Sequence, residues 1–152
     1  MYYIGIDPGK DGCVAILTDK KGAMPTMIPF DEVNASEALQ EVSGHPAIAC
    51  LEHVTAMPKQ GSVSMFNFGM NFGFWQGLLT AYKIPFELVR PDKWKKEFSI
   101  TADKNTSIAV CKRLFPGINL RKSDGCKKDH DGMAESALMA VYAKRRLDGE
   151  RD

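Results

Sequence analysis

The chain has 152 residues, of which 44% are hydrophobic and 26% are charged, and its formal net charge is +1. This composition is typical of a soluble globular protein and excludes an intrinsically disordered chain. No apolar run approaches the roughly 20 residues of a membrane-spanning helix, and the N-terminus enters a strand pattern at once, without the basic and apolar regions of a signal peptide. We therefore expect one cytoplasmic domain over residues 1–152.

The N-terminal part of the chain is expected to form an antiparallel meander. Apolar runs predict strands over 2–7, 13–18 and 24–30, separated by turns rich in Gly, Pro and Asp. Pro25 and Pro29 weaken the third strand, because proline cannot donate a hydrogen bond to a neighbouring strand. This pattern predicts that the first three strands of the chain lie next to one another in the sheet.

A helix, a buried strand and a second helix are expected next. Residues 36–42 read as a short helix with a cap at Asn34 or Ser36, and the apolar run 47–52 suits a buried strand. After a loop over 54–64, a helix is expected over 65–82. It contains three glycines at four-residue intervals, each costing about 1 kcal/mol relative to alanine, and their shared face would permit close approach of another backbone.

The rest of the chain is expected to combine helices with one more strand. The predicted elements are a strand over 86–89, a helix from 91 to 98, a helix capped by Asp103 or Thr101 that ends near 115, a polar basic loop over 118–128, a final helix over about 129–147 and a frayed tail over 148–152. The order β-β-β-α-β-α-β-α-α indicates an α/β fold with a mixed sheet, whose later strands join through helical crossovers.

Acidic residues close two of the apolar strand patterns. Asp7 ends the first strand, where an unpaired buried carboxylate would be costly, although Asp before Pro-Gly is as often a turn cap. Glu52 ends the strand over 47–52, and glutamate is a poor turn former, so its alternative role is a salt bridge with Lys or Arg. Carboxylates that end neighbouring strands can form part of a cage for divalent metal.

Two further acids open the final helix. Asp131 and Glu135 are four residues apart, hence on one helix face and within reach of a shared cation. Two negative charges at this spacing repel each other and destabilise an isolated helix. The alternative to metal binding is that both acids interact favourably with the helix dipole at the N-terminus. Asp129 is a substitute ligand or a cap of the same helix, and His53 and His130 flank the acids as candidates for proton transfer.

The charges are segregated along the chain. Residues 1–89 carry five Lys/Arg and nine Asp/Glu, residues 90–128 carry eleven and four, and residues 129–152 carry four and six. A basic stretch by itself is as often only a solvated surface. Here the basic stretch accompanies candidate metal-binding acids. An enzyme that cleaves a polyanion at carboxylate-bound metal ions needs both, because basic residues attract the substrate and acidic residues hold the metal. Nucleic acid is therefore the favoured partner.

Several motifs occur together: IGIDPG at 4–9, a glutamate ending the fourth strand, and DGMAE at 131–135. In this combination the chain resembles the RuvC-type Holliday-junction resolvases of the ribonuclease H-like superfamily. The stretches 52–69 and 94–96, followed by Lys104, are similar to the bacteriophage and organellar branch. The resemblance covers nearly the whole chain and implies a ribonuclease H-like mixed sheet, with three antiparallel N-terminal strands followed by parallel strands and flanking helices.

The resemblance implies a homodimer that binds a four-way DNA junction and nicks two opposing strands symmetrically. By position, Asp7, Glu52, Asp131 and Glu135 match the four acidic metal ligands and catalytic residues of the family. Carboxylate oxygens are hard ligands that suit Mg²⁺, with Mn²⁺ as a substitute. Hydrolysis of a phosphodiester bond with two such ions would leave a 5′-phosphate and a 3′-hydroxyl. Bacterial members place the last two acids three apart, so direct or water-mediated metal binding by Glu135 stays open.

The resemblance and the basic block together predict the DNA contacts. Lys59 and Gln60 lie on a loop where they could read bases near the cut. Phe66 and Phe68 match the region where the family inserts an aromatic at the junction centre, or else they are core residues of the next helix. Dimer contacts are expected over 69–79. The phosphate-contact candidates are Lys93, Lys95, Lys96, Lys104, Lys112, Arg113, Arg121, Lys122, Lys127 and Lys128.

Two other functions stay open at this point. The chain could be another ribonuclease H-like nuclease that acts on RNA–DNA hybrid or flap DNA, because the acid cage is common to that superfamily. It could also be a junction-binding protein without catalysis. Actin-like ATPases begin with a similar strand, glycine and aspartate, but they need two such domains, and 152 residues leave no room for them.

Overall fold

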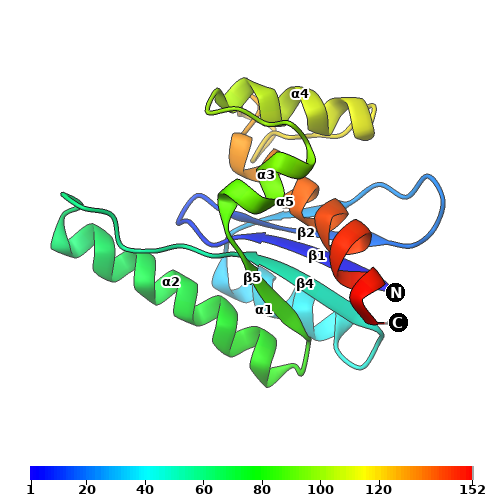
Figure 1. Cartoon of the computed structure of the whole chain (residues 1–152), viewed down its shortest axis with the longest axis horizontal. Coiled ribbons are helices and arrows are strands. Elements are labelled where there is room, and N and C mark those ends of the chain that lie inside the picture. Colours follow the sequence, from blue (N-terminus) through cyan, green and yellow to red (C-terminus); the bar gives the residue numbers. More distant parts are fainter. Residues whose placement is uncertain (152) are drawn as a thin grey trace.

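The computed structural model describes residues 1–151, with side chains described through residue 149, and contains a five-stranded mixed sheet in the order β3-β2-β1-β4-β5 (Figure 1). The central β1 (Tyr2–Asp7) pairs antiparallel with β2 (Cys13–Thr18) and parallel with β4 (Ala47–Glu52). The edge strands are β3 (Thr26–Pro29), antiparallel to β2, and β5 (Phe86–Val89), parallel to β4. This arrangement confirms the predicted fold class.

Helices cover both faces of this sheet (Figure 1). One face is covered by α1 (Glu32–Val42) and α2 (Ser62–Ala81). The other face is covered by α5 (Asp131–Tyr142), with α3 (Pro91–Glu97) and α4 (Lys104–Leu114) packed around it. The last helix continues as a π-helical turn over Ala143–Leu147 and a 3-10 turn over Asp148–Arg151, where a frayed tail was predicted; residue 152 lies outside the described residues.

Alternation along the central strands builds two separate apolar cores. In β1, Tyr3 packs into the core under α5, whereas Ile4 and Ile6 pack into the core under α1 and α2. In β4, Cys50 and Leu51 divide in the same way. Successive strand residues point to opposite faces, so a strand covered on both sides is apolar at nearly every position. The same alternation decides which face receives the acid at each strand end.

Gly5 is the point of closest approach between β1 and α5. A Cβ at this position would lie 2.0 Å from the backbone oxygen of Ser136 and 2.4 Å from the backbone nitrogen of Ala140. Both neighbours are backbone atoms of a buried helix and have no flexible side chain to move aside. The missing side chain therefore sets how closely α5 can rest on the strand that carries Asp7.

Gly5→Ala is expected to lower the free energy of unfolding by about 3 kcal/mol or more, because α5 must shift away from β1 to admit the methyl group. Chemical denaturation followed by circular dichroism measures the change. Gly125→Ala is the matched control: a Cβ there meets nothing within 4 Å, so stability should change by no more than about 0.5 kcal/mol. Equal stabilities of the two variants would show that α5 does not pack on β1 as described.

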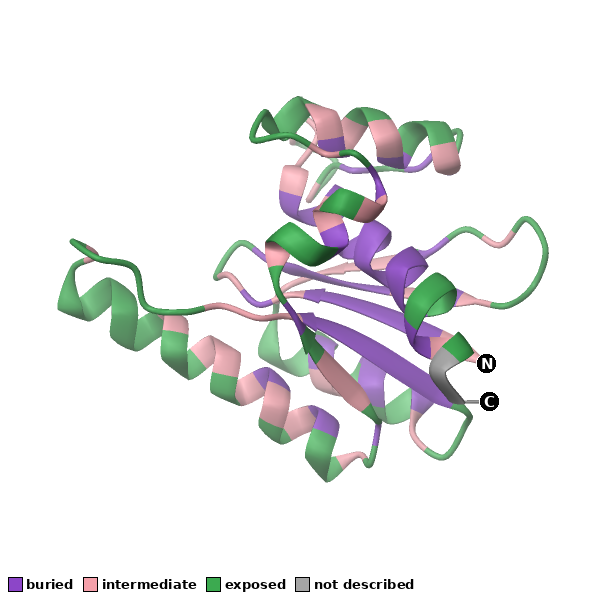
Figure 2. Ribbon diagram, in the orientation of Figure 1, coloured by how far each residue is buried: buried purple, intermediate pink, exposed green. Residues whose placement is uncertain are grey.

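The N-terminal half of α2 extends beyond the body of the protein, and Figure 2 shows it as mostly exposed. Val63 is 73% exposed, Phe66 is 68% exposed and Met70 is 58% exposed, whereas Trp75 and Leu79 farther along are fully buried. The alternative that Phe66 is a core residue is therefore wrong. No helix within residues 1–151 combines the length and hydropathy that crossing a bilayer requires.

Several predicted element boundaries differ from the structure. Asp31 caps α1 by accepting from the backbone nitrogens of Val33 and Asn34, so the helix begins before the predicted caps at Asn34 or Ser36. α2 begins at Ser62 instead of 65, and β3 is shorter than predicted. Asp103 caps α4 as predicted, accepting from the backbone nitrogen of Asn105 at 2.9 Å.

The start of α5 is also corrected. The helix begins at Asp131 with His130 at the cap position, two residues later than predicted. Asp129 neither caps this helix nor joins the other acids, because its carboxylate pairs with the Lys112 ammonium of α4.

Candidate active site

Asp7 and Glu52 lie side by side at the carboxyl ends of two parallel neighbouring strands. The register of β1 and β4 pairs Ile6 with Leu51, which brings the two following residues to the same edge of the sheet. Because Ile6 and Leu51 both face the core under α1 and α2, alternation turns both acidic side chains toward the opposite face, where α5 lies. The parallel register thus creates the first half of the site.

The first turns of α5 supply the second pair of acids, Asp131 and Glu135. Gly132 lies against the Asp7 carboxylate: a Cβ there would be 2.8 Å from Oδ2 of Asp7. The hydroxyl of Ser136 lies 2.8 Å from the backbone oxygen of Cys13, which holds the same part of α5 on β2. Asp7, Glu52, Asp131 and Glu135 therefore lie at one end of the sheet, beneath the N-terminus of α5.

Burial, with a smaller contribution from neighbouring carboxylates, raises the pKa values of Asp7, Glu52 and Glu135. Burial raises the pKa of Glu52 to about 7, and the charges of Asp7 and Glu135 act in the same direction. Burial also raises the pKa of Asp7, with a further contribution from Asp131. The pKa of Glu135 is raised by burial and by the charges of Asp7 and Asp131. Each of these three pKa values is also raised by the charge of at least one other acid of the cluster, as expected for carboxylates in one desolvated site.

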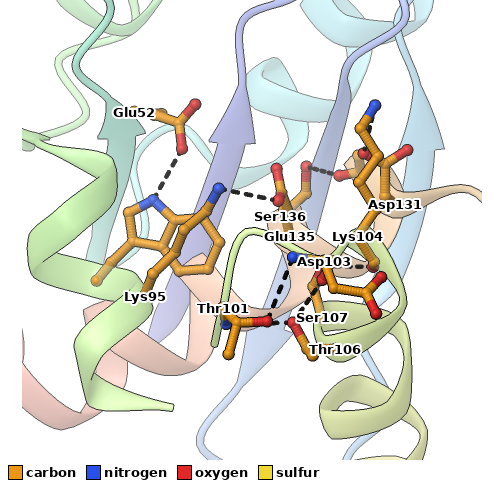
Figure 3. A network of polar contacts seen from close by, with 12 residues as sticks. Glu52, Lys95, Thr101, Asp103, Lys104, Thr106, Ser107, Asp131, Glu135 and Ser136 are labelled. Atoms are coloured by element: carbon orange, nitrogen blue, oxygen red, sulfur yellow. Dashed lines mark hydrogen bonds and ion pairs between the residues drawn. The ribbon is translucent and has the colours of Figure 1, made fainter. Parts of the chain in front are cut away.

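Two lysines balance the acids of α5 (Figure 3). Nζ of Lys95 lies 3.3 Å from Oε1 of Glu135, and these side chains are 32% and 15% exposed. Nζ of Lys104 lies 3.5 Å from Oδ2 of Asp131, but this lysine is 79% exposed. An exposed pair is worth little and exchanges readily with solvent, so the half-buried pair of Lys95 and Glu135 is the firmer contact.

Neutral N–H groups hold the two acids of the strands. The backbone nitrogen of Gly9 donates to Oδ1 of Asp7 at 3.1 Å. The indole nitrogen of Trp94, a fully buried residue of α3, donates to Oε2 of Glu52 at 2.8 Å. Trp94 lies in the stretch 94–96 that contributed to the family resemblance. Nothing in the sequence, however, predicts its contact with an acid 42 positions away.

An open cleft of about 860 Å³ adjoins Asp7 and Asp131. One wall is the turn between β1 and β2, and the other wall is the N-terminal half of α2 with the residues just before it. Among the predicted DNA-binding residues, it brings together Gln60, Phe68 and Lys104. Sequence reasoning missed the other polar residues that line it from these two walls, which are Lys10, Asp11, Ser64, Asn67 and Asn71.

The other predicted DNA-binding residues lie outside this cleft. Lys93 and Lys96 line a separate hollow with Tyr142 and Arg146. Lys112 and Arg121 line a third hollow beside α4. The remaining predicted basic residues are Lys59, Arg113, Lys127 and Lys128, all exposed, and Lys122, which pairs with Asp11 at 3.0 Å on the turn that borders the cleft. The predicted basic residues are thus distributed over separate hollows and exposed positions, and Lys104 is the one among them that lines the cleft beside Asp131.

The two histidines next to the acids differ in their surroundings. His130 lines the cleft, and its Nδ1 is buried without a hydrogen-bond partner among residues 1–151. His53 stacks on Phe72, with ring centroids 6.2 Å apart and an interplanar angle of 22°. His130 is therefore the histidine that a molecule bound in the cleft could reach.

The residues present fit a divalent metal ion. Among residues 1–151, no three Asp, Glu, His or Cys side chains converge as closely as they would around a bound ion. Hard carboxylate oxygens are nevertheless the donors that Mg²⁺ and Mn²⁺ prefer. Burial holds the pKa values of Asp7, Glu52 and Glu135 above their usual range, so these desolvated carboxylates would gain from a bound cation, and the ammonium of Lys95 already pairs with Glu135.

No protein-family model and no curated protein matches the chain. Solved structures of Thermus thermophilus RuvC do match in fold. One has a TM-score of 0.63 with 12% sequence identity, covering 99% of this chain and 97% of that chain. Another, T. thermophilus RuvC in complex with Holliday junction substrate, has a TM-score of 0.63 with 13% identity, covering 95% and 96%. The chain therefore has the RuvC-type fold that its motifs predicted.

Proposed function

We propose that this protein is a metal-dependent endonuclease that resolves four-way DNA junctions by nicking two opposing strands symmetrically. The observation that carries the proposal is the meeting of Asp7, Glu52, Asp131 and Glu135 at one end of a RuvC-type fold, beside an open cleft. The T. thermophilus RuvC structure with a Holliday junction substrate supports a four-way junction as the DNA partner.

Asp7, Glu52, Asp131 and Glu135 are the residues that would hold two Mg²⁺ ions, or Mn²⁺ in their place. Such ions, when bound, supply activation of a water molecule and stabilisation of the leaving 3′ oxygen, which yields a 5′-phosphate and a 3′-hydroxyl. The N–H groups of Gly9 and Trp94 orient the two strand acids without cancelling their charge. The Lys95 ammonium limits repulsion at Glu135.

The cleft and its border offer the contacts that a DNA strand needs. Lys104 lines the cleft with a 79% exposed side chain, so its ammonium can turn to a phosphate that enters beside Asp131. Gln60 and Phe68 lie on the opposite wall, where they would meet bases near the cut. Phe66, 68% exposed, is free to stack on an unpaired base at the junction centre.

The exposed half of α2 supports a homodimer. Symmetric cuts on opposing strands require two active sites, and the chain provides one set of the four acids. Met65 and Met70 expose apolar side chains on this helix. Gly69 and Gly73 have nothing within 4 Å of a Cβ position, so they leave open space for another backbone. Burial of this apolar surface between two copies would favour association.

A synthetic immobile junction tests the proposal. With Mg²⁺, we expect paired nicks at symmetric positions across the branch point, each ligatable, when cuts are mapped separately on all four strands. Matched linear duplex, RNA–DNA hybrid and flap substrates serve as controls and should be cut at least about tenfold more slowly, a difference of roughly 1.4 kcal/mol in transition-state binding. Equal cutting of hybrid and junction would favour the alternative, another ribonuclease H-like nuclease.

A further inference from the structure

Trp94 connects the buried core to the candidate active site. It lies in the first turns of α3, directly after β5, and its side chain is fully buried in the core under α5. The only polar atom of this side chain, Nε1, donates to Oε2 of Glu52 at 2.8 Å. A large side chain packed on all sides has a fixed rotamer, so the direction of this N–H group is fixed as well.

This hydrogen bond differs in kind from the lysine contacts in the same site. The Lys95 ammonium cancels charge at Glu135, and a divalent cation would compete with it for the same oxygens. The Trp94 N–H group is neutral, so it orients Glu52 and leaves the negative charge available. Among the residues whose side chains are described, 1–149, none donates a hydrogen bond to the second oxygen, Oε1 of Glu52. That oxygen is therefore free for a cation.

We propose that Trp94 is a positioning residue, whose N–H group holds Glu52 in the orientation that binds divalent metal. This inference rests on the proposed function only in taking Glu52 as a metal ligand. Partners that orient a metal ligand typically account for about 10- to 100-fold in metal affinity. Trp94 thus acts through Glu52, and its loss should be visible in metal binding itself, with or without DNA.

Trp75 provides a matched control within the chain. It is also fully buried, but it packs in the core on the opposite face of the sheet. Its Nε1 has no hydrogen-bond partner among the described residues 1–151. Trp75→Phe and Trp94→Phe therefore remove the same atoms from similarly buried positions, and only the second change removes a hydrogen bond to an acid.

The first experiment compares Mn²⁺ affinity in the wild type and both variants by isothermal titration calorimetry, without DNA. We expect Trp94→Phe to weaken the affinity about 10- to 100-fold, while Trp75→Phe stays within about twofold of the wild type. In junction nicking, the Mg²⁺ concentration for half-maximal rate should rise by a similar factor for Trp94→Phe, with most of the rate recovered at saturating Mg²⁺. Equal affinities of the two variants would overturn the inference.

The second experiment uses the wild-type protein, so it does not depend on a folded Trp94 variant. Its ¹H–¹⁵N spectrum contains one indole resonance for each of its two tryptophans. Titration with Mg²⁺ should move the Trp94 resonance and leave that of Trp75 in place. A Trp94 resonance that stays in place, or no binding of Mg²⁺ or Mn²⁺ at all, overturns the inference. A wild type that binds metal but nicks no DNA instead refutes the proposed function, while the two titrations still decide the role of Trp94.

Discussion

Replacing Asp7 with Asn is expected to lower the rate of junction nicking by at least about 10³-fold while leaving junction binding nearly unchanged. Asp7 lies against α5 and interacts with the charge of Asp131, so it occupies the centre of the acid cluster. Asn keeps the size of the side chain and an oxygen that can accept from the Gly9 N–H group, but it removes the charge. Single-turnover nicking with Mg²⁺ and fluorescence anisotropy in EDTA measure the two quantities separately.

Asp19→Asn is the control for removing one negative charge. Asp19 is 57% exposed and pairs with the N-terminal amino group, away from the cleft-lining residues. We expect its nicking rate to stay within about twofold of the wild type, because exposed ion pairs contribute little. If Asp7→Asn changes neither binding nor nicking, Asp7 is not a ligand. A wild type that binds junctions and never nicks them would instead indicate a junction-binding protein without catalysis.

Glu52→Gln is expected to increase the free energy of unfolding at pH 8 by on the order of 3 kcal/mol while abolishing nicking. The pKa of Glu52 is raised from 4.5 to about 7 in the folded protein. Between these pH values the folded state binds more protons than the unfolded state, so stability falls as pH rises. At pH 8 the ionised carboxylate therefore opposes folding, by about 1.4 kcal/mol for each pH unit that separates the folded pKa from the unfolded one. Gln keeps an acceptor for the Trp94 N–H group without the charge.

Urea denaturation at pH 5 and pH 8 in EDTA measures this difference. Near pH 5 Glu52 is protonated in the folded protein and still partly ionised in the unfolded chain, so the advantage of Glu52→Gln should shrink to about 1 kcal/mol or less. Glu37→Gln, on the exposed side of α1, is the control, and its stability should stay within about 0.5 kcal/mol of the wild type. A Glu52→Gln variant less stable than the wild type at pH 8 would mean that nearby cations already compensate the charge.

The sheet and the acids were predictable because their signals are local. Each strand is a short apolar run closed by a turn, and an acid that ends such a run conflicts with core packing unless it has a role. Asp7 and Glu52 stand out for this reason, and four-residue spacing places Asp131 and Glu135 on one helix face. That the two pairs face each other depends on β1 pairing with β4 in parallel, which became visible only in the structure.

The residues that support the acids were not predictable. Trp94, Lys95 and Lys96 are consecutive, yet the first is buried against Glu52, the second pairs with Glu135 and the third lines another hollow. Only the orientation of α3 on the sheet separates these roles. The start of α1 was missed for a similar reason: Asp31 and Asn34 are both good caps. In the structure α1 starts at Glu32, just after Phe30, whose ring packs on Trp75 with centroids 5.5 Å apart.

The pairing of Ile6 with Leu51 limits how the chain can change its length. A substitution within β1 or β4 alters one side chain, but insertion or deletion of one residue turns every following side chain to the other face of the sheet. Asp7 or Glu52 would then point toward α1 and α2 and away from α5. Apart from Gly5 and the two acids, the strands can therefore vary in composition but not in residue count. The loop over 19–25, at the end of β2 far from both acids, can lengthen freely.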